Sequence, residues 1–205
     1  MKRGVLTLIL LVCIGLTANA TATSSSYPRF TFGAEWNYDA VFINAVHQYF
    51  YAPEGFIEEI KQINTDYHNN IDATVHAGYN FNENWNLSLY LGCTQVGEYA
   101  PAIPISLRAT RYFGANPLKD RWFSFIDLGS GISIKKEPQE IFTGKIGGGY
   151  RLSLGKYSKL DFLLALRAIY THPVVEYGEN IIDRDKVNRN DGYVGGVSFG
   201  IGLTF

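Results

Sequence analysis

The sequence has 205 residues, of which 46% are hydrophobic, 15% are aromatic and only 18% are charged. The charged fraction lies below the roughly 25% of ordinary soluble domains. The mean hydropathy of -0.05, without long apolar runs in the body of the chain, excludes a bundle of membrane-spanning helices. So many apolar residues also exclude a disordered chain. A net charge of -1, without clusters of lysine or arginine, argues against a nucleic-acid partner.

The beginning of the chain has the pattern of a secretory signal peptide. Lys2 and Arg3 supply the positive start, an apolar stretch follows, and small residues up to Ala22 provide a cleavage site. The apolar stretch of about a dozen residues is shorter than the roughly 20 that a membrane-spanning helix requires. We therefore expect residues 1–22 to be removed on export and residues 23–205 to form a β-barrel domain.

Apolar and polar residues alternate along most of the remaining chain, in eight segments of roughly the length at which a tilted strand crosses a membrane. In residues 71–81, for example, Val75 and Ala77 lie on one face, while Thr74 and His76 lie on the other. One face suits lipid and the other suits a polar environment. The eight segments are residues 30–38, 71–81, 85–92, 105–113, 122–134, 142–152, 160–170 and 193–205.

The connections between the segments differ in length in a regular way. Short connections at 82–84, 114–119 and 155–159 contrast with long ones, notably 39–70 and 172–191. An even number of strands places both ends of a closed barrel on one side, and closure satisfies every backbone group that lipid cannot. The sequence therefore predicts an all-β fold, an eight-stranded antiparallel transmembrane up-and-down β-barrel, with the short turns on the side of the termini.

The predicted inner face carries charged residues of both signs. They are Glu35, Asp72, Asp127 and Asp161 together with Arg108, Lys145, Arg151 and Arg167. Because the interior of an eight-stranded barrel is only wide enough for side chains, we expect these residues to form a buried network of ion pairs. A narrow pore would instead need inner charges that fail to pair. A soluble barrel, such as a periplasmic lipid carrier, would have an apolar interior and a charged exterior.

The last segment carries apolar and aromatic residues on one face up to its final position. These residues are Tyr193, Val197, Phe199, Ile201, Leu203 and Phe205. With the signal peptide and the eight alternating segments, this pattern resembles the small Gram-negative outer-membrane barrels of the OmpX and OmpA transmembrane-domain type. The resemblance implies a location in the cell outer membrane, with outer-membrane lipid around the barrel. It also implies insertion by periplasmic chaperones and the barrel assembly machinery, which would read the terminal pattern as an assembly signal.

The first long connection leaves two questions open. Phe56, Ile57, Ile60 and Ile63 have helical spacing, which predicts a short amphipathic helical turn. Residues 41–51 either extend the first strand or form part of an extra hairpin, and the second alternative would give ten strands.

Both long connections could bind a surface ligand. The mixed-charge run at residues 183–191 in the second of them is expected to be a solvated surface. In the first, aromatic and apolar residues exceed what a solvated loop needs. The candidates for contact with a ligand are Tyr49, Phe50, Tyr51, Phe56 and Ile60.

The sequence contains no evident catalytic constellation. We therefore predict a non-enzymatic barrel with an envelope-structural role or a loop-mediated role in surface binding or adhesion. The competing hypothesis is an outer-membrane lipid hydrolase or acyltransferase that uses His172 with Ser130 or Ser133, although no motif of a barrel lipid hydrolase is present. The four histidines lack metal-ligand spacing, so we expect no metal and no cofactor.

Overall fold

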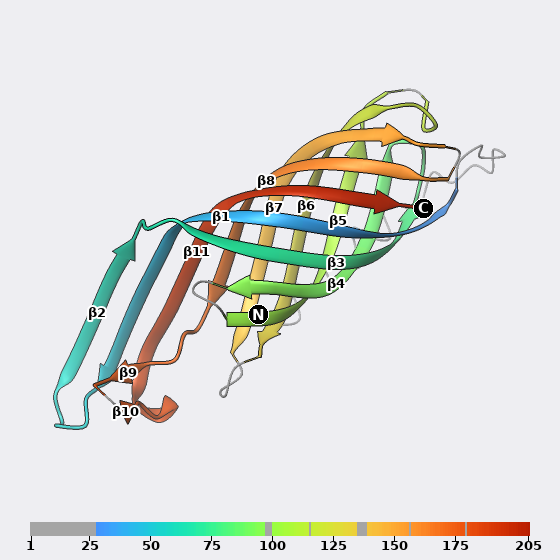
Figure 1. Ribbon diagram of the computed structural model, residues 1–205. Coiled ribbons are helices and arrows are strands. Elements are labelled where there is room, and N and C mark those ends of the chain that lie inside the picture. The colour runs from blue at the N-terminus through green and yellow to red at the C-terminus, as the bar shows by residue number, and fades with distance from the viewer. Residues whose placement is uncertain (1–27, 97–99, 115, 135–138, 156, 179) are drawn as a thin grey trace.

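The computed structural model describes residues 28–96, 100–114, 116–134, 139–155, 157–178 and 180–205. The predicted signal peptide lies outside the described residues. Within them the chain forms an antiparallel up-and-down barrel (Figure 1). Its wall consists of β1 (Phe30–Tyr51), β3 (His68–Asn80), β4 (Trp85–Val96), β5 (Ala100–Tyr112), β6 (Arg121–Ser133), β7 (Glu140–Ser153), β8 (Lys159–Thr171) and β11 (Val187–Thr204). Since β11 pairs with β1 and closes the wall, the predicted eight-stranded barrel is confirmed.

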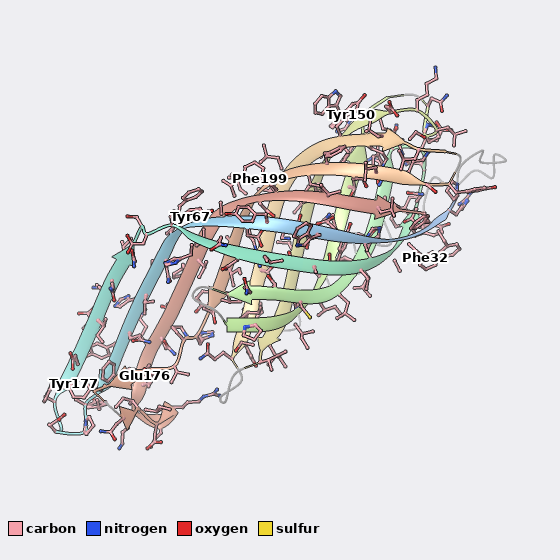
Figure 2. The ribbon with its side chains drawn as sticks, viewed as in Figure 1. Phe32, Tyr67, Tyr150, Glu176, Tyr177 and Phe199 are labelled. Atoms are coloured by element: carbon pink, nitrogen blue, oxygen red, sulfur yellow. The ribbon has the colours of Figure 1, made fainter. Side chains whose placement is uncertain are left out.

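The outer face of the barrel is apolar over the whole circumference. Phe32 and Phe199 point away from the wall in Figure 2, and Trp122 and Leu128 are 65% and 66% exposed. Neighbouring strands are hydrogen-bonded around the closed sheet, so the backbone of the wall needs no water. This distribution is the reverse of that in a soluble barrel. No helix in the described ranges is long and apolar enough to cross a membrane.

The first and last strands meet on the side of the short turns. Phe32 and Phe205 exchange two backbone hydrogen bonds, of 3.0 and 2.7 Å. Between β3 and β4, the side-chain oxygen of Asn82 accepts hydrogen bonds from the N–H groups of Asn84 and Trp85, both at 2.9 Å. An asparagine that caps its own turn in this way allows a connection of few residues.

Part of the barrel interior is apolar, which explains an irregularity in the sequence of β6. Phe123 and Phe125 interrupt the expected alternation because they lie inside, where both are buried. They form a cluster with Tyr112, Leu163 and Ala165. The interior therefore contains aromatic layers as well as charged ones, and an inward position in this barrel does not have to be polar.

Gly149 of β7 makes room for this cluster. A Cβ atom at position 149 would collide with the carbonyl oxygen of Phe162 and would lie 2.6 Å from the ring of Phe123, closer than real Cβ contacts come. Gly149→Ala is therefore expected to lower the free energy of unfolding by about 1–3 kcal/mol, because both the backbone of β8 and the packed ring have to move. Gly155→Ala is the matched control, since Gly155 has no atom within 4 Å of such a Cβ. Urea unfolding in lipid vesicles measures both, and equal stability of the two variants would contradict the explanation.

The first long connection is mostly strand rather than loop. β1 continues to Tyr51, well past the predicted end at residue 38, and pairs with β3 over residues 30–41. Beyond an irregularity between Val41 and Ile43 it pairs with β2 (Ile57–Asn64) instead. The helical turn predicted from the spacing of Phe56, Ile57, Ile60 and Ile63 is therefore wrong. The alternative of ten strands is also wrong, because β2 pairs only with the part of β1 that projects beyond the barrel.

The second long connection also contains regular structure. β9 (Glu176–Tyr177) pairs with β10 (Asn180–Ile181), and a single 3-10 turn follows at Arg184–Lys186. β11 begins at Val187, so Arg189 and Asp191 belong to a strand. Residues 183–186 and Arg189 are exposed, so the predicted solvated surface is confirmed for this part of the run. The strand forms there because the projecting part of β1 offers it a hydrogen-bonding edge.

Candidate functional site

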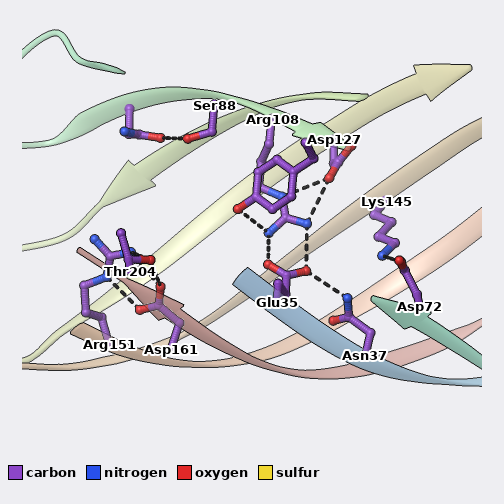
Figure 3. A network of polar contacts seen from close by, with 12 residues as sticks. Glu35, Asn37, Asp72, Ser88, Arg108, Asp127, Lys145, Arg151, Asp161 and Thr204 are labelled. Carbon is purple, nitrogen blue, oxygen red and sulfur yellow. Dashed lines mark hydrogen bonds and ion pairs between the residues drawn. The ribbon is translucent and has the colours of Figure 1, made fainter. Parts of the chain in front are cut away.

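Arg108 of β5 is the centre of the charge network inside the barrel (Figure 3). Its Nε donates a hydrogen bond to Oδ2 of Asp127 at 2.9 Å, and its Nη2 donates to Oε1 of Glu35 at 3.0 Å. It also donates to the hydroxyl of Tyr90 at 3.1 Å, and it lies over the rings of Tyr90 and Phe125. One guanidinium group thus neutralises two buried carboxylates from opposite parts of the wall.

The remaining charges predicted for the interior are also paired. The pairs are Lys145 with Asp72, Arg151 with Asp161, and Arg167 with Asp39. Arg151 binds Asp161 through two parallel hydrogen bonds of 2.6 Å each, the geometry that favours arginine over lysine. Asp39 was missing from the predicted set because we assigned it to a loop. Its position two residues beyond Asn37 on the same inner face was the signal that could have found it.

This interior is filled rather than open. The cavities beside the ion pairs have volumes of about 20 and 30 Å³, which is room for one or two water molecules. All eight predicted inner charges have partners of opposite sign, whereas a narrow pore would require charges that fail to pair. The arrangement is therefore suited to fixing the shape of the barrel.

The residues proposed for catalysis are not assembled into a triad. The ring of His172 lies 3.1 Å from the hydroxyl of Tyr170, and Ser133 is buried and accepts a hydrogen bond from the backbone of Gln139. Ser130 is exposed on the outer face of β6. His172, Ser133 and Ser130 thus have different surroundings, and in the described part of the chain no hydrogen bond joins the histidine to either serine.

The projecting strands form a second structural unit, which we call the extension. It comprises residues 43–64, 174–178 and 180–192, and it continues away from the barrel at the end opposite the C-terminus (Figure 1). In membrane barrels the long connections are on the outside of the cell. The outer parts of β11 and β1 form a three-stranded sheet with β2, in the order β11-β1-β2. The extension is therefore a folded platform on the cell surface.

The extension has a hydrophobic core of its own. Phe50 is fully buried and clusters with Val175 and Ile182, and Ile60, Tyr177 and Val187 pack around them. Gln48 fixes the same face, because its amide nitrogen donates to Oδ1 of Asn190 at 3.2 Å. The β9–β10 segment is thus held against the inner face of the sheet, and the platform has a defined shape.

The opposite face of this sheet is exposed and carries charged groups among apolar ones such as Tyr51 and Ile57. Glu59 of β2 accepts from Nζ of Lys61 at 2.7 Å and contacts the ring of His47 at 2.9 Å. The hydrogen bonds from Lys61 and then from His47 hold the pKa of the Glu59 carboxyl below its ordinary value. Arg189 and Asp191 form a second ion pair, 2.5 Å long, on β11. Charges on this face therefore alternate in sign and are open to a partner.

The residues predicted for surface contact divide between the two faces. Tyr51 and Phe56 are 44% and 49% exposed near the tip of the extension, and Tyr49 is partly exposed. Ile60 is partly buried against the core, and Phe50 is fully buried. Including Phe50 among the contact residues was wrong, because it stabilises the platform and has no surface to offer.

An open pocket of about 690 Å³ lies where the extension joins the barrel. Its lining combines His172 and Pro173 with Glu140 of β7 and with Asn188 and Arg189 of β11. Ile132, Val174, Val175, Ile182 and Val187 complete the lining, so the pocket offers a ligand both polar groups and apolar surface. Sequence reasoning missed this pocket because its walls come from strands that are far apart along the chain.

The residues of the predicted assembly signal lie together on one strand. Tyr193, Phe199, Ile201, Leu203 and Phe205 are exposed on the outer face of the barrel, and Val197 is partly exposed between them. Their placement is the one that an outward-facing signal requires. Recognition by the assembly machinery stays a prediction.

No protein-family model matches the chain, and no curated protein sequence matches it. Solved structures do resemble it. The outer membrane protein OprG of Pseudomonas aeruginosa aligns over 88% of this chain and 98% of its own with 10% identity and a TM-score of 0.50. Neisserial surface protein A aligns over 90% and 100% with 13% identity and a TM-score of 0.46. The N-terminal barrel domain of Pseudomonas aeruginosa OprF aligns over 83% and 97% with 14% identity and a TM-score of 0.42.

At these identities the likeness is one of fold. The location follows from the fold together with its surface, because a closed barrel with an apolar wall and paired charges inside is stable only with lipid around it. The predicted location in the outer membrane is thereby confirmed. The chain is an eight-stranded outer-membrane β-barrel with the architecture of the OmpX and OmpA transmembrane-domain type.

Proposed function

We propose that this protein is a non-enzymatic surface-binding protein, in which the barrel anchors the extension and the extension carries out adhesion. The observation that carries the proposal is the separate hydrophobic core of the extension around Phe50. A barrel with only a structural role in the envelope is already closed below residue 42 and gains nothing from a platform beyond it. Ordering these residues costs conformational entropy, which a binding function explains.

The interior of the barrel supports the same proposal. Paired charges and an aromatic cluster fill it, which suits a rigid anchor and does not suit conduction. On the extension, Tyr51, Phe56 and Ile57 are exposed beside alternating charges. Exposed tyrosine and phenylalanine are enriched at protein interfaces relative to the rest of a protein surface.

The test is to excise the extension along the registers of the wall. Val41 pairs with His68 and Thr171 pairs with Gly192, so residues 42–67 and 172–191 can each be replaced by an Asn-Gly hairpin turn. Bacteria displaying either protein are applied to plastic, to collagen-coated plastic and to a lawn of bacteria that display the intact protein. We expect the excised barrel to fold, as seen from its altered gel migration after boiling, and retention on at least one surface to fall at least tenfold. Equal retention of folded intact and excised protein on all three surfaces would refute the proposal.

A further inference from the structure

The outer edge of β2 is an unpaired strand edge. In the sheet order β2 comes last, and no strand among the described residues pairs with its second side. The N–H of Ala52 donates to the carbonyl of Phe56 at 2.8 Å, which shows that Phe56 directs its backbone groups towards β1. In an antiparallel ladder this direction alternates along the strand. The backbone groups of Ile57, Glu59, Lys61 and Ile63 therefore point to the free edge, where they can bind another strand.

The side chains of β2 make this edge complementary to itself. We consider antiparallel pairing of β2 with β2 of a second copy. In a continuous sheet, residues that lie opposite each other have their side chains on the same face, so the possible registers differ by two residues. With Ile60 opposite Ile60 of the second copy, Glu59 lies opposite Lys61 of the second copy, and Lys61 opposite its Glu59. In this register, each residue whose backbone groups point to the free edge lies opposite a residue of the second copy whose backbone groups also point to its free edge. The two strands can therefore form hydrogen-bonded pairs along their length.

The adjacent registers are unfavourable. A shift in one direction places Glu59 opposite Glu59, and a shift in the other places Lys61 opposite Lys61. Like charges directly opposite each other destabilise a sheet. The register centred on Ile60 also brings Ile57 against Ile63 of the second copy, and these side chains are 47% and 76% exposed in one chain alone. The sequence of β2 thus selects a single self-pairing register.

The direction of β2 determines where the second barrel lies. β2 begins near the tip of the extension and runs back towards its own barrel. In an antiparallel pair, each β2 runs towards its own barrel and opposite to its partner, so the two barrels lie at opposite ends of the joined sheet. Because the extension continues away from the membrane, the second barrel belongs to a membrane that faces the first (Figure 1).

Resting on the proposed function, we infer that the partner bound by the extension is a second copy of this chain in an apposed membrane. The two sheets join through β2 into one continuous sheet. Seven residues of overlap, 57–63, correspond to about 24 Å at 3.4 Å per residue, so the two membranes come close together. Where each surface carries many copies, many weak contacts form at once and together give a strong attachment.

The experiment uses the full mature chain folded into phosphatidylcholine vesicles, with clustering followed by light scattering. Vesicles carrying the intact protein are expected to cluster. Lys61→Glu and Glu59→Lys are each expected to reduce clustering at least tenfold, since each places like charges opposite each other in the selected register. Mixing the two kinds of variant vesicle restores opposite charges at both positions, and so does combining both substitutions in one chain. Both combinations are therefore expected to cluster like the intact protein.

Failure of the mixed vesicles to cluster, while those with the intact protein do, would overturn the register and the inference. Absence of clustering with the intact protein would overturn self-pairing as well. The proposed function is tested separately by retention on plastic and collagen: loss of retention on excision there would leave it standing even if self-pairing failed. Energy transfer between labelled copies confined to the same vesicle would show association within one membrane and would also contradict the inference.

Discussion

Arg108→Leu should lower the free energy of unfolding by about 3–5 kcal/mol, because it leaves Glu35 and Asp127 as buried charges without their ion-pair partner. Both carboxylates are hydrogen-bonded to this guanidinium, and both residues are 5% exposed or less. Leucine also removes the contact with the ring of Tyr90, but that loss is smaller than the cost of two orphaned charges. Urea unfolding in lipid vesicles, followed by tryptophan fluorescence, measures the change.

Arg111→Leu provides the matched control on the same strand. Arg111 faces outward near the rim, where its guanidinium carbon lies 5.8 and 5.5 Å from the ring centroids of Trp85 and Phe113. We expect its replacement to change stability by no more than about 1 kcal/mol, since no buried charge loses its partner. Adding Glu35→Gln and Asp127→Asn to Arg108→Leu should recover more than half of the loss. A triple variant no more stable than the single one would show that packing, and not charge, is the contribution of Arg108.

The barrel itself could be predicted because each wall strand has one face in lipid. That constraint produces alternation in every strand, and a slip by one residue would turn charges such as Asp72 or Arg151 into the membrane. The even strand count and the lengths of the turns then determine the topology. Prediction was weakest in β6, where Phe123 and Phe125 face inward. Whether an inward position is polar or apolar depends on the side chains that it contacts across the barrel, and these come from other strands.

The extension could not be predicted in the same way. The apolar residues of β2 are spaced like those of a helix, yet the segment is a strand, because it completes the edge of β1 and buries only Ile60 against the core. Pairing with β1 and the packing of Ile60 against distant core residues such as Val175 together decide this, and strand preference depends strongly on such contacts. For the same reason, sequence alone placed Phe50 among surface residues and Asp39 in a loop.

Phe50→Ala should separate the stability of the extension from that of the barrel. The variant leaves a cavity between Val175 and Ile182, and core phenylalanine truncations cost about 3–5 kcal/mol. Because the cluster consists of residues of the extension, the cost falls on local opening of the extension. We expect trypsin to cleave the folded protein in vesicles at least tenfold faster at Lys61 or Lys186, while the shift in gel migration on boiling is unchanged.

Phe56→Ala removes the same side chain from an exposed position and should change the rate of cleavage by less than about twofold, because a half-exposed ring leaves no cavity. Equal protection of the Phe50→Ala variant and the intact protein would show that the extension does not depend on its core. If the extension does open in Phe50→Ala, β2 loses the fixed edge on which its pairing register depends. Clustering of vesicles should then fall with protease resistance, although Glu59 and Lys61 are both still present.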